Sequence, residues 1–170
     1  MNVRAILLFL WSQVGWFACV LGASRGHRWL GPVIVAVSLA VHVGRRRERL
    51  REGAVLAVSA LVGFLVDTAL LRAGVVRISG ASFPPLWLVA LWPNFIATTA
   101  QDGILRSLPR RPLLAAILGA IGGPLAYDAG ARLGAIALGP NRLVSLAVVG
   151  LVWAAAVPCL VAVRARLVPA

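Results

Sequence analysis

The chain has 170 residues, 61% of them hydrophobic, and a mean hydropathy of +0.92. Five acidic residues face seventeen basic ones, so the formal net charge at neutral pH is +12. This apolar content exceeds what a soluble core can bury, which predicts an integral membrane protein and excludes an ordinary soluble enzyme. The basic residues are arginines in short gaps between apolar runs, where they set membrane topology, so we expect no nucleic-acid partner.

Six apolar windows reach or approach the roughly 20 residues that a membrane-spanning helix needs. We therefore predict an all-α fold, a single integral membrane domain over residues 1–170 with about six transmembrane helices. The predicted helices lie near 3–22, 28–44, 53–71, 84–105, 112–129 and 142–163. The segment 130–139 either extends the fifth helix or forms a short outer segment.

The first window has features of a secretory signal peptide, with Arg4 before the apolar run and small residues at its end. Its length, Gln13 and two tryptophans favour a retained helix instead.

The arginines also predict an orientation. Eleven of them fall on the side of the two termini and six on the other side, which places both termini in the cytoplasm. The block GRRRERLRE at residues 44–52 has an alternative role, because such clusters bind anionic lipid head groups.

A short motif recurs in the two halves of the chain. Leu10-Trp11-Ser12-Gln13 and Leu91-Trp92-Pro93-Asn94 both run leucine, tryptophan, small residue, amide. With three spans in each half, this similarity fits a 3+3 inverted repeat whose polar groups, Gln13 and Asn94, meet near the midplane. Chance similarity between apolar segments is the alternative.

Ionised groups inside spanning segments are costly, by about 2.5–3.5 kcal/mol for an aspartate at a helix centre. Asp102 lies four residues before Arg106, and Asp128 lies four residues before Arg132. On a helix this order suits an ion pair, so Asp102 is predicted to be structural and neutralised locally. Arg132 either neutralises Asp128 in the same way or binds an anionic ligand.

Asp67 has no basic residue four positions away and needs a partner from another helix. We predict Arg132 or the Tyr127 hydroxyl as that partner, in a polar pocket near the outer leaflet that also holds Asp128. The full set of candidate ligand-binding residues is Asp67, Asp128, Arg132, Tyr127, Gln13, Asn94, Trp87 and Trp92.

Small residues recur every four positions at Gly122, Ala126, Gly130 and Gly134, which predicts a smooth helix face on which another helix packs closely.

Sequence patterns of known catalytic and metal sites are missing from the chain. Cys19 and Cys159 lack a disulfide or zinc spacing, and neither a His/Glu metal motif nor Gly-x-Ser-x-Gly occurs. His42 beside the arginine block and His27 in an outer loop fit interface positions better than catalytic ones. We expect no metal and no cofactor, assign no catalytic residue, and favour a role other than that of an enzyme.

Several motifs spread over nearly the whole chain are typical of one known family. They are LWSQVGWFACVLGA at 10–23, Trp29-Leu30-Gly31-Pro32, Asp67, Pro84-Pro85-Leu86-Trp87-Leu88, Leu91-Trp92, Phe95-Ile96-Ala97-Thr98-Thr99 and GGPLAYDAG at 122–130. In these motifs the chain resembles the uncharacterised bacterial inner-membrane proteins grouped as domain of unknown function 2878. The resemblance implies a multi-pass protein of the bacterial inner membrane and supplies no activity or substrate.

Two classes of function fit these observations best. The first is a small transporter or lipid-handling carrier, and the alternative is a membrane-embedded enzyme or an assembly partner in lipid modification. The expected partners are membrane lipids, a small-molecule or lipid substrate, and either a second copy of the chain or a membrane enzyme.

Overall fold

The structure is a computed structural model that describes residues 3–168. The described chain forms six α-helices, one 3-10 turn and two very short strands. Their bounds are α1 (Val3–Ser24), α2 (Leu30–Gly44), α3 (Arg49–Arg72), β1 (Val76–Arg77), α4 (Leu86–Ala97), η1 (Leu108–Arg110), α5 (Pro112–Arg132), β2 (Ala137–Leu138) and α6 (Arg142–Leu167). The predicted all-helical fold is confirmed.

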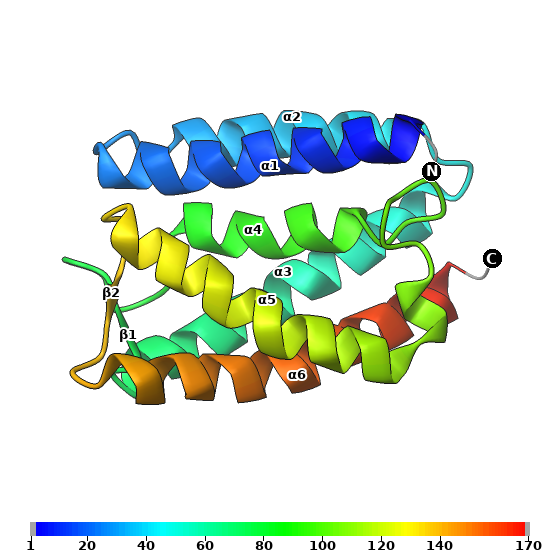
Figure 1. The fold of residues 1–170 in the computed structure, drawn as a ribbon. Coiled ribbons are helices and arrows are strands. Elements are labelled where there is room, and N and C mark those ends of the chain that lie inside the picture. The colour runs from blue at the N-terminus through cyan, green and yellow to red at the C-terminus, as the bar shows by residue number, and fades with distance from the viewer. Residues whose placement is uncertain (1–2, 169–170) are drawn as a thin grey trace.

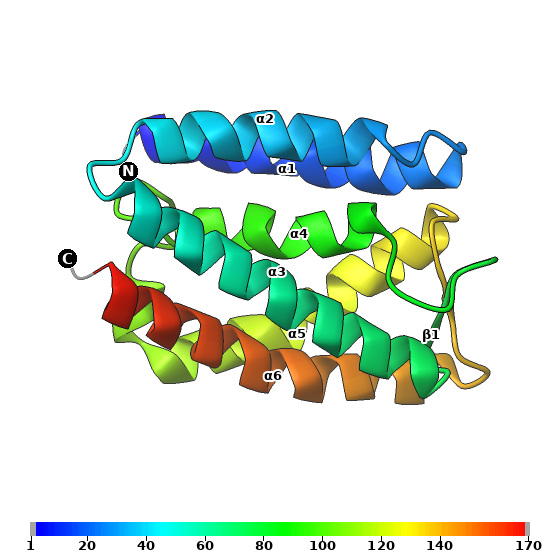
Figure 2. The same cartoon turned by 180° about the vertical axis from the view of Figure 1, so that it is seen from behind.

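Successive helices run in opposite directions along one common axis (Figure 1). The start of α1, the end of α6, the α2–α3 connection and the α4–α5 connection therefore lie together at one end of the bundle (Figures 1 and 2). Eleven of the seventeen arginines belong to the segments at this end, which we call the arginine-rich end.

Local sequence explains where several helices begin. The Asn141 side chain accepts a hydrogen bond of 3.1 Å from the Val144 N–H, which caps the start of α6. Pro112 opens α5, at a position where the missing N–H would have no helical partner anyway.

Four helices, α1, α3, α5 and α6, are long and apolar enough to cross a membrane. Their outward faces expose large apolar side chains, such as Leu61 and Leu65 of α3, which are 58% and 57% exposed. The other two helices are shorter, with 15 residues in α2 and 12 in α4. At 1.5 Å per residue, α4 is about 18 Å long, well short of a hydrocarbon core of about 30 Å.

The fourth helix ends at Ala97, although the sequence predicted a helix to about residue 105. Beyond Ala97 the chain folds back, and the Leu105 N–H donates to the Thr98 carbonyl at 3.1 Å. The last carbonyls of α4 accept backbone hydrogen bonds from residues three positions on, such as that from the Thr99 N–H to the Ile96 carbonyl, and the Thr99 hydroxyl and Arg164 also donate to the Ile96 carbonyl. These contacts replace the hydrogen bonds that a longer helix would have made.

The helices pack as two hairpins, α1–α2 and α5–α6, with α4 lying against α1, α2 and α3. The similar motifs on α1 and α4 touch, since the Asn94 amide donates to the Ser12 carbonyl at 2.9 Å. However, α4 and α5 are not packed together as α1 and α2 are. This asymmetry gives no support to the 3+3 inverted repeat.

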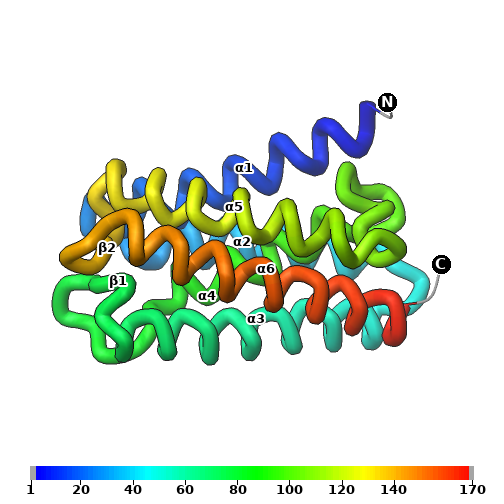
Figure 3. Tube along the Cα trace, turned by 60° about the horizontal axis from the view of Figure 1, so that its bottom comes forward, coloured from blue at the N-terminus to red at the C-terminus, as the bar shows by residue number. Residues whose placement is uncertain are grey.

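The segment 130–139 does not extend α5 beyond Arg132. The chain turns at Gly134, whose φ of +81° suits glycine, and then forms β2. β2 pairs antiparallel with β1 in the register Val76↔Leu138, at the end of the bundle far from the termini (Figure 3). The pairing joins the α3–α4 and α5–α6 connections.

Candidate functional site

A cavity of about 540 Å³ runs along α1, α4 and α5, and we call it the lateral groove. Five of the candidate residues line it: Gln13, Trp87, Trp92, Asn94 and Tyr127. Most of its other lining residues are apolar, and they include Phe9, Phe17, Leu91, Phe95, Leu118 and Leu125.

The groove is open at the surface between α1 and α5. Phe17 on α1 is 48% exposed and Leu125 on α5 is 65% exposed, yet both line the cavity. The opening therefore lies on the long apolar side of the bundle and faces lipid if the helices cross a membrane.

Small residues on α5 create the space in the groove. Gly122, Ala126 and Gly130 all line it, and a Cβ at Gly122 would meet no atom within 4 Å. The sequence prediction that this stripe packs against another helix is therefore wrong. The glycines that do pack closely are Gly119 and Gly123, which lie against Trp153 of α6.

Asp67 lies directly behind the groove wall and is almost fully buried, with 1% of its surface exposed. It accepts hydrogen bonds from the Trp92 indole N–H at 3.0 Å and from the Tyr127 hydroxyl. Gly63 makes room for this arrangement, since a Cβ there would lie 2.1 Å from an indole carbon of Trp92. Asp67 thus holds two groove-lining aromatic rings in place.

Asp128 and Arg132 form no contact with Asp67 among the described residues. The predicted outer pocket is therefore two separate sites. Arg132 donates to Asp128 at 2.8 Å, and Arg142 from the start of α6 donates to the same carboxylate. Of the two partners predicted for Asp67, the structure places only Tyr127 against it. The Asp128 group ties α5 to α6 at the surface.

The two central amides both engage α1. Asn94 donates to the Ser12 carbonyl, while Gln13 donates to the Ser12 hydroxyl at 3.2 Å. Both amides nevertheless line the lateral groove, so they place polar atoms in its mainly apolar wall.

Sequence reasoning missed a buried ion pair at the arginine-rich end. Arg164 of α6 contacts both carboxylate oxygens of Glu52 of α3, at 2.8 and 3.0 Å, and both side chains are at most 4% exposed. The His42 ring nitrogen Nε2 lies 2.7 Å from the same carboxylate. Arg46 donates to His42 Nδ1 at 3.2 Å, which fits the tautomer whose Nε2–H donates to Glu52.

Asp102 pairs with Arg46 and Arg4, and the predicted pair with Arg106 is wrong. The i,i+4 geometry does not exist here because residues 98–107 are not helical. Partial burial alone would raise the pKa of Asp102, but the hydrogen bond and charge of Arg46, with the charge of Arg4, hold that pKa below its usual range.

These groups offer apolar contact, hydrogen bonds and positive charge. Within residues 3–168 no group of three or more His, Cys, Asp or Glu side chains is placed to hold a metal ion. The lateral groove has a mainly apolar surface with a few polar side chains, and the arginine-rich end carries positive charge.

An all-helical chain with four apolar helices of membrane length is a multi-pass membrane protein. Residues 5–159 match the family described as "Protein of unknown function (DUF2878)", and the chain belongs to this family. No curated protein and no solved structure matched the chain.

Proposed function

We propose that the protein is a lipid-handling carrier that holds an apolar chain of a membrane lipid in the lateral groove. The observation that carries this proposal is the groove itself. Its volume of about 540 Å³ falls in the range of roughly 300–1,000 Å³ typical of ligand sites, and its walls are mainly apolar. Its opening between α1 and α5 would let a lipid enter sideways without leaving the bilayer.

The proposal includes an orientation in the bacterial inner membrane. Positive charge favours the cytoplasmic side, so the arginine-rich end and both termini would be cytoplasmic. Asp67 and Tyr127 would then lie towards the outer leaflet. Reporter fusions near residues 48 and 109 are expected to report a cytoplasmic location, and fusions near 26 and 78 an external one. A fusion at 48 that reports an external location would contradict this orientation.

A larger side chain at position 122 can fill the groove without disturbing the fold, because a Cβ there meets no atom within 4 Å. We expect purified Gly122→Phe protein to retain less co-purified lipid than the wild type when both are analysed by native mass spectrometry. Leu65→Trp, on the outward face of α3, is the matched control and should retain wild-type amounts. Equal lipid retention in all three proteins would contradict the carrier proposal.

A deletion strain distinguishes the carrier from the other classes of function. A changed distribution of existing lipids between the leaflets supports the carrier. Loss of a chemically modified lipid would support the membrane-embedded enzyme or assembly partner. An unchanged lipidome with altered solute flux would support a small-molecule transporter.

A further inference from the structure

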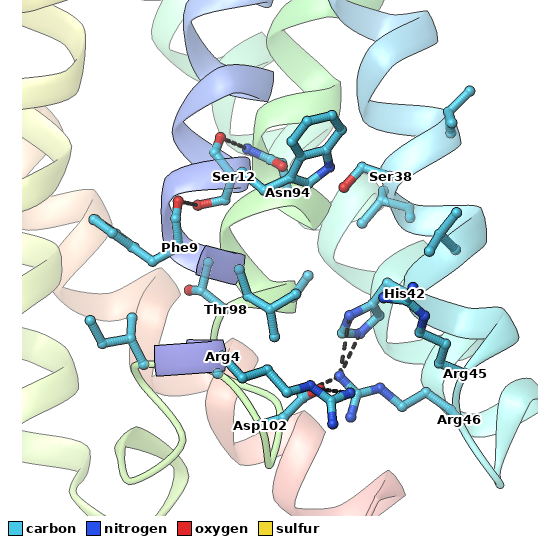
Figure 4. A pocket seen from close by; sticks show the side chains of 18 residues that line it. Arg4, Phe9, Ser12, Ser38, His42, Arg45, Arg46, Asn94, Thr98 and Asp102 are labelled. Atoms are coloured by element: carbon cyan, nitrogen blue, oxygen red, sulfur yellow. Dashed lines mark hydrogen bonds and ion pairs between the residues drawn. The ribbon is translucent and has the colours of Figure 1, made fainter. Parts of the chain in front are cut away.

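A second cavity, of about 260 Å³, lies at the arginine-rich end between α1, α2 and the turn that follows α4. We call it the arginine cavity. Figure 4 shows Arg4 from α1 and Arg46, which follows α2, converging on Asp102, with Arg45 alongside. Residues that are far apart in the sequence thus bring three guanidinium groups to one cavity.

The charges in this cavity do not cancel. Among the described residues, Asp102 is the single carboxylate that lines it, against the guanidinium groups of Arg4, Arg45 and Arg46. Within residues 3–168 the Arg45 side chain forms no ion pair with a carboxylate, although Arg46 and Arg4 both contact Asp102. The Arg46 Nε–H is buried and has no acceptor among the described residues. A buried donor without an acceptor is unfavourable, and an anion supplies acceptors.

Orientation in the membrane does not explain this convergence. A topology signal requires only that positive charge follow a helix on the cytoplasmic side. It does not require that Arg4 and Arg46 share one aspartate, nor that Arg45 line the same cavity. The planar guanidinium fork, however, matches the oxygen geometry of a phosphate group.

The interior of the cavity changes from charged to apolar. Beyond the arginines its walls include Leu8, Val37 and Ile104, with the Ser38 hydroxyl on α2 directed towards α4 (Figure 4). The volume is below the usual range for a whole drug-sized ligand, so it suits a phosphate group with a short attached moiety.

We propose that the arginine cavity binds a phosphate group, carried either by an anionic lipid head group or by a free phosphate in solution. Arg45 and Arg46 contact the phosphate oxygens, and Arg4 balances Asp102 at the mouth. The site is separate from the lateral groove, although Phe9, Ser12, Asn94 and Thr98 line both cavities. Phosphate binding is therefore expected to persist in Gly122→Phe, so the two proposals fail independently.

The test uses the full-length protein and two probes. Inorganic phosphate is titrated into detergent-solubilised protein by calorimetry, and retention of phosphatidylglycerol over phosphatidylcholine is measured by native mass spectrometry from mixed nanodiscs. Arg45→Gln removes an exposed side chain that forms no ion pair in the described chain. Arg110→Gln is the control, because Arg110 is exposed at the same end, carries the same charge and does not line the cavity.

We expect Arg45→Gln to weaken binding about tenfold or more, as the loss of a charge-assisted hydrogen bond predicts, with Arg110→Gln within about twofold of wild type. Arg45→Lys, which keeps the charge and loses the fork, should fall between them. Saturable phosphate binding that depends on Arg45 identifies a free phosphate, whereas Arg45-dependent retention of phosphatidylglycerol alone identifies a lipid head group. Absence of binding in both assays, or equal effects of the Arg45 and Arg110 substitutions, would overturn the proposal.

Discussion

Removal of the Tyr127 hydroxyl tests the environment of Asp67. Tyr127 and Asp67 are 5% and 1% exposed, and the hydroxyl is one of two donors to this carboxyl group. Tyr127→Phe keeps the aromatic ring against Trp153 but leaves a buried acceptor with one donor fewer. Such a loss costs about 1–3 kcal/mol, which corresponds to a change of about 5- to 150-fold in the unfolding equilibrium.

The free energy of unfolding can be measured by steric trapping in bicelles. Thr68→Val is a suitable control, because the Thr68 hydroxyl donates at 2.6 Å to the Phe64 carbonyl of its own helix and not to Asp67. We expect the control to change stability little. Trp92→Phe removes the second donor, and its effect should be non-additive with that of Tyr127→Phe since both act on one carboxyl group. If Tyr127→Phe and Thr68→Val destabilise equally, the hydrogen bond is not stabilising and the reasoning is refuted.

Two further substitutions test the packing of α3. Gly63→Ala should destabilise the protein in a thermal unfolding assay and reduce lipid retention, because the new methyl group overlaps Trp92. Gly53→Ala is the control and should be neutral or slightly stabilising, because no atom lies within 4 Å of the new Cβ. Glu52→Gln breaks a buried ion pair and should lower the free energy of unfolding by about 3–5 kcal/mol. Glu48→Gln breaks an exposed pair and should lower it by about 0–1 kcal/mol. Similar melting temperatures for the two variants would contradict the structural role of Glu52.

The sequence predicted the positions of the helices because length and hydropathy are local properties. It did not predict where α4 ends, because the contacts made at that boundary include one from Arg164, which lies 68 positions from Ile96 and is invisible to local patterns. The local rule for ion pairs worked at Asp128 and Arg132, which share a helix, and failed at Asp102, which does not lie on one.

The candidate site was predictable in part for similar reasons. Asp67 was identified as an acid without a local base, and shared depth indicated Arg132 or Tyr127 as its partner, of which only Tyr127 contacts it. The Glu52 pair was missed because its acid lies in an arginine block that already had an explanation as a topology signal. An acidic residue inside a basic block at the start of an apolar helix was the available clue. The groove could not be predicted, because the sequence pattern of a stripe of small residues is the same whether the stripe packs against a helix or lines a cavity.

The central claim is that a lipid chain occupies the lateral groove, and photo-crosslinking in the native membrane tests it most directly. Cells are fed a fatty acid with a photoreactive group in its chain, illuminated, and the crosslinked residues of the purified protein are mapped by mass spectrometry. We expect crosslinks to concentrate on groove residues such as Leu91 and Ala126, and to fall there in Gly122→Phe, relative to Leu61 and Leu65 on the outward face of α3. Crosslinks on the outward face with none in the groove would contradict the claim.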